Sequence, residues 1–267
     1  MIAVDELVHN KGAKALENPN PCKDLKVHLS ICLELQKLVD RILHIILATE
    51  SARPNCTLAI KALCSLHLHL NKANSIIKHS SECSKLYMAM TSHRILSRCE
   101  KIRNAFELYL TQIQSAVPLS LAAEISGILH DLKDTEFSLG IEEVEARKAI
   151  LALYEKDLND SASSMENAEL EAIQIATSRL KINSTFSLIV EKASLRKQLD
   201  QVINNDTNQK EKQLLQYLLY LLMRYGKFIH QIGSNSLDHD LVVDKEHSHQ
   251  VMESIDNVVR DFEVLST

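Results

Sequence analysis

Two cysteines and three histidines lie within twenty residues of this chain, at Cys64, His67, His69, His79 and Cys83. Such side chains can bind transition metals or act as nucleophile and base. On a helix, however, His67 and His69 point about 200° apart and cannot share a metal ion. Structural zinc sites use four ligands, usually in close pairs, and the segment has no such pairs. We therefore predict core cysteines and surface histidines here.

Cys64 is the least clear member of this cluster, because it shares a helix face with His67. It also adjoins the apolar residues Leu63 and Leu66, and a buried free cysteine behaves as a small hydrophobe. We interpret it as a core residue. The acidic and histidine-rich stretch 238–249, "DHDLVVDKEHSH", is interpreted as a solvated linker. For the whole chain we predict no catalytic, cofactor-binding or metal-binding residue.

A second set of residues suggests an enzyme. The stretch 121–134, "LAAEISGILHDLKD", places His130 and Asp131 together, with His93 upstream. This arrangement resembles the HD phosphohydrolases, in which His, His-Asp and a later Asp bind a divalent metal that activates water. The later residue would be Asp200 or Asp206. The Gly-Lys that usually follows His-Asp in that family is absent, so this hydrolase stays an alternative.

Four long helices are expected to position these residues. Apolar residues recur at spacings of three and four, which is the period of a helix with one buried face. The stripes are Cys32, Leu35, Val39, Ile42 and Ile46; Ala59, Leu63, Leu66, Leu70, Ala73 and Ile77; Ile95, Cys99, Ile102, Phe106, Tyr109 and Ile113; and Leu121, Ile125, Ile128, Leu132 and Leu139. Proline ends the first and third, within "ARPN" (52–55) and at Pro118. Short connections predict an elongated antiparallel four-helix bundle over 23–140.

More helices are expected after the bundle, so the predicted fold class is all-α. Residues 141–231 form a second helical region, packed on or beside the first. The expected helices cover 141–158, 168–182, 185–203 and 210–229, with a polar gap, "NDSASSMEN", at 159–167. The run "LLQYLLYLLM" (214–223) is apolar on nearly all sides and should be the buried centre. Residues 1–22 read as a flexible leader, and 232–267 as a polar linker with a weak helix at 251–265.

Composition excludes several classes of function. The 267 residues carry a net charge of −5 without a basic stripe, so the footprint of nucleic-acid binding is missing. The longest apolar run is about half of what spans a bilayer, and the first residues have no signal-peptide pattern. The six cysteines lie in the first hundred residues, without a CxxC pair. Reduced thiols in the cytosol or nucleus are therefore expected.

Several short motifs follow one another in a fixed order. "RPN" (53–55) precedes "AIKALCSLHLHLNKANSIIKHSSECSKLYMAMT" (59–91), which contains ALCSL, the Lys72-Ala73 step and SKLY at 84–87. Later come "LTQIQSAVPLSLAAEISGIL" (110–129), "EAIQIA" (171–176) and "EKQLLQYLLYLLMRYGKFI" (211–229). Motifs in this order resemble the N-terminal domain of plant U-box ubiquitin ligases, over about residues 24 to 230.

The resemblance implies a region that binds partners and selects targets. In these ligases a U-box, a metal-free RING-like fold, follows the helical domain and holds the ubiquitin-loaded conjugating enzyme. This sequence has no Cys-Pro-Ile run and no cysteine after Cys99, so we expect it to lack the U-box and to have no catalytic activity alone. The conjugating enzyme is a partner only if a U-box follows.

The implied partners are proteins, with receptor-like kinases and trafficking proteins as candidates, in the cytoplasm, the nucleus or peripherally at the plasma membrane. Lys72, Lys78, Lys85 and Arg94 are candidate exposed positions. Lys85 and Tyr87 of the SKLY run could equally fix a helix junction, since a tyrosine can bury its ring and hydrogen-bond its hydroxyl. A stand-alone adaptor that competes with full-length relatives is the main alternative. A membrane-perturbing bundle is disfavoured by the acidic balance.

Overall fold

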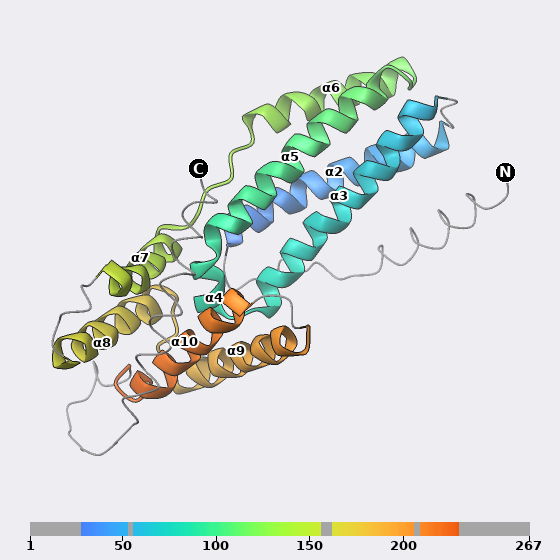
Figure 1. Ribbon diagram of the computed structural model, residues 1–267. Coiled ribbons are helices and arrows are strands. Elements are labelled where there is room, and N and C mark those ends of the chain that lie inside the picture. The colour runs from blue at the N-terminus through green and yellow to red at the C-terminus, as the bar shows by residue number, and fades with distance from the viewer. Residues whose placement is uncertain (1–27, 53–55, 156–161, 206–208, 230–267) are drawn as a thin grey trace.

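The computed structural model describes residues 28–52, 56–155, 162–205 and 209–229, and every regular element in these ranges is a helix (Figure 1). This confirms the predicted all-α class. In chain order the helices are α2 (Leu29–Ser51), α3 (Thr57–Glu82), α4 (Lys85–Met90), α5 (Ser92–Gln114), α6 (Leu119–Asp134), α7 (Ile141–Glu155), α8 (Ala162–Arg179), α9 (Thr185–Asn205) and α10 (Gln209–Tyr225).

The first four long helices form the predicted elongated antiparallel bundle. α3 packs against both α2 and α5, and α6 packs against both α5 and α2, so the four helices close around one core (Figure 1). The apolar stripes explain this arrangement, because each helix can bury its stripe only against the others. Side chains from all four helices are fully buried there, including Leu35, Ile42, Leu66, Phe106 and Ile125.

Two expectations for the bundle need correction. Tyr109 and Leu139 are only partly buried. Helix α6 ends at Asp134, so Leu139 lies in the connection after it and the predicted fourth helix was too long. The extended backbone of Thr135 terminates the helix at this point, and its hydroxyl donates to the Asp131 carbonyl in the last turn.

The second helical region consists of two packed helix pairs, α7 with α8 and α9 with α10 (Figure 1). Helix α10 also contacts α8 and α4, which agrees with the central position predicted for residues 214–223. Its buried face includes Leu215, Leu218 and Leu222, whereas Met223 is 52% exposed. Within the run 214–223 only Gln216 and Met223 are exposed, so the helix reaches the surface along one narrow face.

The predicted polar gap at 159–167 was too long, because α8 begins at Ala162. The residues added to α8 include one partner of a tertiary contact. Glu166, inside the expected gap, pairs with Arg224 of α10 at 2.6 Å, and a local reading of sequence does not include such partners. The predicted leader (1–22), the linker and weak helix (232–267) and the proline turn (53–55) lie outside the described residues. The domain boundary at residue 140 stays a prediction.

We expect the Phe106→Ala substitution to lower the free energy of unfolding by about 3–5 kcal/mol, because it removes a fully buried aromatic side chain and leaves a cavity. Leu108→Ala is the matched control. Leu108 is on the same helix and 53% exposed, so its truncation should change stability by no more than about 0.5 kcal/mol. Chemical denaturation followed by circular dichroism measures both. Equal losses would contradict the assigned core.

Candidate functional site

The six-residue helix α4 lies where the bundle meets the second helical region (Figure 1). It contacts α5 of the bundle and α7, α9 and α10 of the second region. All its residues from Leu86 to Met90 are buried. We call α4 and the polar side chains that bond to it the α4 junction.

Glu191 of α9 satisfies the N-terminus of α4. Its carboxylate accepts hydrogen bonds from the Ser84 hydroxyl, from the Leu86 N–H at 2.9 Å and from the Lys85 N–H at 3.1 Å. The Ser84 N–H donates to the side-chain oxygen of Gln198 at 2.9 Å. The first N–H groups of a helix have no partner within it, and negative charge is favourable at that end. These bonds therefore fasten α9 to the start of α4.

The SKLY run makes two further bonds to the second region. The Lys85 ammonium donates to the Leu180 carbonyl at 2.8 Å, and the Tyr87 hydroxyl donates to Glu211 at 2.6 Å. Burial, together with the hydrogen bond to Glu211, raises the pKa of Tyr87. Of the two roles left open for Lys85, these contacts favour the helix junction over the exposed binding position, because Lys85 is half-buried.

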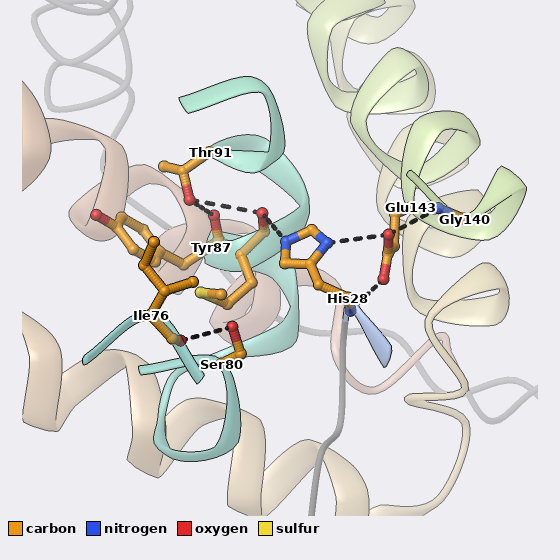
Figure 2. Close-up of polar contacts among 8 residues, drawn as sticks. His28, Ile76, Ser80, Tyr87, Thr91, Gly140 and Glu143 are labelled. Carbon is orange, nitrogen blue, oxygen red and sulfur yellow. Dashed lines mark hydrogen bonds and ion pairs between the residues drawn. The ribbon is translucent and has the colours of Figure 1, made fainter. Parts of the chain in front are cut away.

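A histidine and a glutamate connect α2 to α7 across α4 (Figure 2). His28 Nδ1 lies 3.0 Å from a Glu143 carboxylate oxygen, and Nε2 lies 3.0 Å from the Met88 carbonyl. The imidazole ring thus bridges the Glu143 carboxylate and the backbone carbonyl of α4. The His28 and Gly140 N–H groups also donate to Glu143. Burial raises the pKa of Glu143, but the hydrogen bonds and charge of His28 outweigh it, and the net pKa is lowered.

The cysteine and histidine cluster is largely dispersed. His67 pairs with Glu50 at 2.9 Å, while His69 bonds to the Ser65 carbonyl and lies against the Tyr109 ring. Cys64 is exposed, so its interpretation as a core residue was wrong. It follows the buried Leu63, and one residue along a helix turns the side chain by about 100° toward solvent.

Only His79 and Cys83 of this cluster lie together, with 3.1 Å between Cys83 Sγ and His79 Nδ1. Such a pair can form a thiolate nucleophile if its environment is electropositive. Here burial, with Glu82 and Glu211 nearby, raises the pKa of Cys83 to about 12. The thiol therefore stays protonated and behaves as a core side chain.

The residues of the HD alternative lie apart. Asp131 pairs with Arg41 at 2.6 Å, and the exposed His130 faces Asp134 at 3.6 Å. Arg103 bonds to the Thr135 carbonyl, which places the end of α6 beside residue 103. His93 is ten residues earlier on α5, about 15 Å farther along the axis.

The last residue of that motif does not complete it either. Asp200 is exposed on α9, and Asp206 lies outside the described residues. Within the described ranges, no three His, Cys, Asp or Glu side chains are grouped to hold a metal. The geometry therefore does not support the hydrolase alternative.

An open pocket lies between α2 and α6, with a volume of about 330 Å³. It is lined by Arg41, His44, Ile45, Glu124 and Ile128. Arg41 is already paired with Asp131 across these helices. The pocket thus lies on the bundle surface and away from the α4 junction.

The carboxylates of the α4 junction are occupied by donors. Glu191 and Glu143 each accept backbone N–H groups, and Glu211 accepts the Tyr87 hydroxyl. Such an arrangement fixes the orientation of helices rather than presenting a reactive group to a substrate. Sequence reasoning missed these residues, although Glu191 carried a signal: it lies on the apolar stripe of α9 between Leu188 and Leu195, where a charge needs a buried partner.

Comparison with known proteins gives relatives of one kind, all from Arabidopsis thaliana. U-box domain-containing protein 6 is 36% identical over 211 residues, which cover 79% of this chain and 27% of the relative. U-box domain-containing protein 5 is 40% identical over 171 residues, covering 64% and 23%. U-box domain-containing protein 45 is 34% identical over 204 residues, covering 76% and 26%. The match spans about a quarter of the length of these relatives.

Two other comparisons gave no match. No protein-family model matches this chain, and no solved structure is significantly similar to it.

We expect the Glu191→Gln substitution to lower the free energy of unfolding by about 2 kcal/mol, because an amide NH₂ would replace one of the oxygens that accept the donors of Ser84, Lys85 and Leu86. Asp200→Asn, at an exposed position of the same helix, is the matched control and should have little effect. Urea unfolding measures the difference. A neutral Glu191→Gln would show that α9 does not depend on this carboxylate.

Acid should weaken the contact between α2 and α7. Because the pKa of Glu143 in the folded chain is below its ordinary 4.5, its stabilising contribution is present above about pH 4.5 and is lost as the pH falls through the lowered value. Glu143→Gln should therefore be less stable at neutral pH and lose less stability on acidification. The exposed Glu142→Gln is the control. Parallel pH profiles for wild type and Glu143→Gln would contradict this assignment.

Proposed function

We propose, on the premise that this chain corresponds to one region of the plant U-box domain-containing proteins, that it is the partner- and substrate-binding region of a U-box-type E3 ubiquitin ligase. The observation that carries the proposal is the 36% identity over 211 residues, nearly four fifths of the chain. Transfer of ubiquitin to a substrate lysine is the activity we infer for a protein that contains this region together with a U-box.

The role of the region in such a ligase is to hold a protein substrate in a defined position. Four long helices offer extended outer faces, on which Lys72, Lys78 and Arg94 are exposed. The α4 junction supports this role, because it fixes the bundle relative to α7, α9 and α10 through buried bonds. A partner bound to the bundle is then held in a fixed orientation relative to the second helical region.

The candidate partners are cytoplasmic domains of receptor-like kinases and trafficking proteins, which family resemblance suggests. The corresponding location is the cytoplasm, the nucleus or the cytoplasmic surface of the plasma membrane. Among the described residues, no helix combines the length and apolarity needed to cross a bilayer.

A stand-alone adaptor would use the same surfaces without transferring ubiquitin. Sequencing the transcript across codon 267 separates the two: a reading frame that continues into a Cys-Pro-Ile-type U-box favours the ligase, and a stop codon favours the adaptor. The binding role is common to both.

The binding role predicts competition with a full-length relative. Proteins captured by this chain in plant cells should be purified and tested as substrates of U-box domain-containing protein 6, with activating and conjugating enzymes present. We expect a tenfold excess of the chain to slow ubiquitination of a shared substrate at least about threefold, as occupancy of one binding site requires. The chain alone should form no ubiquitin conjugates.

The control competitor is an unrelated helical bundle of the same size, which should not slow the reaction. If the captured proteins are not ubiquitinated by the relative, and the chain does not compete, the proposed substrate-binding role is wrong.

A further inference from the structure

The outer face of the α9–α10 hairpin exposes several large apolar side chains. Phe186 is 76% exposed, Ile189 61%, Met223 52% and Phe228 41%. Exposed apolar side chains that occur singly are ordinary on a soluble protein, whereas a group of them on one face indicates an interaction site. Whether these four form a group depends on how α9 and α10 pair.

The pairing of α9 and α10 brings them together. Lys192 Nζ lies over Gly226, 3.1 Å from where a Cβ would stand, and Arg196 donates to the Met223 sulfur at 3.5 Å. Because the helices are antiparallel neighbours (Figure 1), Ile189, one turn before Lys192, comes level with Phe228. Phe186 continues the same line one turn farther.

We call the face made by Phe186, Ile189, Lys192, Arg196, Met223 and Phe228 the hairpin seam.

The hairpin seam carries two cations among its apolar groups. Among the described residues, no carboxylate forms an ion pair with Lys192 or Arg196, and the acidic residue of this stretch of α9, Glu191, is turned inward to α4. Partial burial and the charge of Arg196 lower the pKa of Lys192, which means that they disfavour its charged form. A carboxylate placed beside the two cations would stabilise that charged form.

We propose that the hairpin seam docks an acidic amphipathic helix of a partner protein, with the apolar face of that helix on Ile189 and Met223 and its flanking carboxylates on Lys192 and Arg196. This inference rests on the proposed partner-binding function and assigns it a surface. A helix fits because it can lie along two antiparallel helices as bundle helices do. The eleven residues from 186 to 196 extend about 15 Å, or about three turns of a docked helix.

Two other occupants fit the charges less well. In a symmetric dimer the same surface faces itself, so Lys192 and Arg196 would oppose their own copies. An anionic membrane would attract the two cations but repel a chain whose net charge is −5.

The first test uses two synthetic 14-residue peptides and the full 267-residue chain. Both peptides have leucines at i, i+3, i+4 and i+7, and one has glutamates and the other lysines at the flanking positions. By fluorescence anisotropy at about 0.15 M salt, we expect the glutamate peptide to bind at least about tenfold more tightly, which corresponds to 1.4 kcal/mol.

The double substitution Lys192→Glu and Arg196→Glu should reverse this preference, so that the lysine peptide becomes the tighter ligand. Lys101→Glu, which changes an exposed cation of α5, is the matched control and should leave the preference unchanged. Ile189→Ser should weaken both peptides, whereas Leu108→Ser should weaken neither. Circular dichroism confirms that each variant is folded.

Equal binding of both peptides, or no binding by the folded chain, would overturn the proposal. So would self-association in sedimentation that Ile189→Ser abolishes, or charge-dependent binding to vesicles containing about 30% anionic lipid without peptide preference.

If the charge-reversed chain still competes with the relative for substrate, the partner-binding function holds and the seam is not its site. If the peptide preference reverses but no competition occurs, the seam binds helices and the substrate-binding function fails.

Discussion

The burial of α4 is the constraint on which the arrangement of the other helices depends. A helix of six residues is too short to be stable by its own hydrogen bonds, and its unpaired N–H groups cannot be buried without acceptors. Glu191 supplies those acceptors, and Tyr87 reaches Glu211 from the same short helix. The bundle can thus bury α4 only if α9 and α10 are in place. The polar bonds and the apolar packing therefore require the same orientation of the two regions.

This constraint also determines how the polar groups of the described interior are used. A catalytic carboxylate or thiol must be able to exchange a proton or reach a substrate. Glu143 and Glu191 are held by backbone N–H groups, and the Cys83 thiol is kept protonated by burial. Their chemistry is used within the fold, which leaves the exposed helical faces as the surfaces available to a partner.

Those faces differ in character. The bundle exposes scattered leucines and lysines, whereas the hairpin seam combines Phe186 and Ile189 with two cations that form no ion pair with a carboxylate in the described part of the chain. The polar side chains of α9 are thus divided between two tasks. Glu191 faces inward and secures α4, while Lys192 and Arg196 stay near the outer face. If the seam binds a partner, one helix both fixes the internal orientation and presents the bound protein.

The sequence by itself determined the all-α class, the four bundle helices and their core, because the three-and-four spacing of residues such as Leu35, Leu66 and Phe106 leaves only one face of each helix to bury. It also offered the SKLY run as one of two alternatives for a helix junction. Only the tertiary structure decided the partners of that junction. The bond between Leu86 and Glu191 joins residues 105 positions apart, and that between His28 and Glu143 joins residues 115 apart. No local period encodes such pairs, because they depend on which helix faces meet after the helices pack.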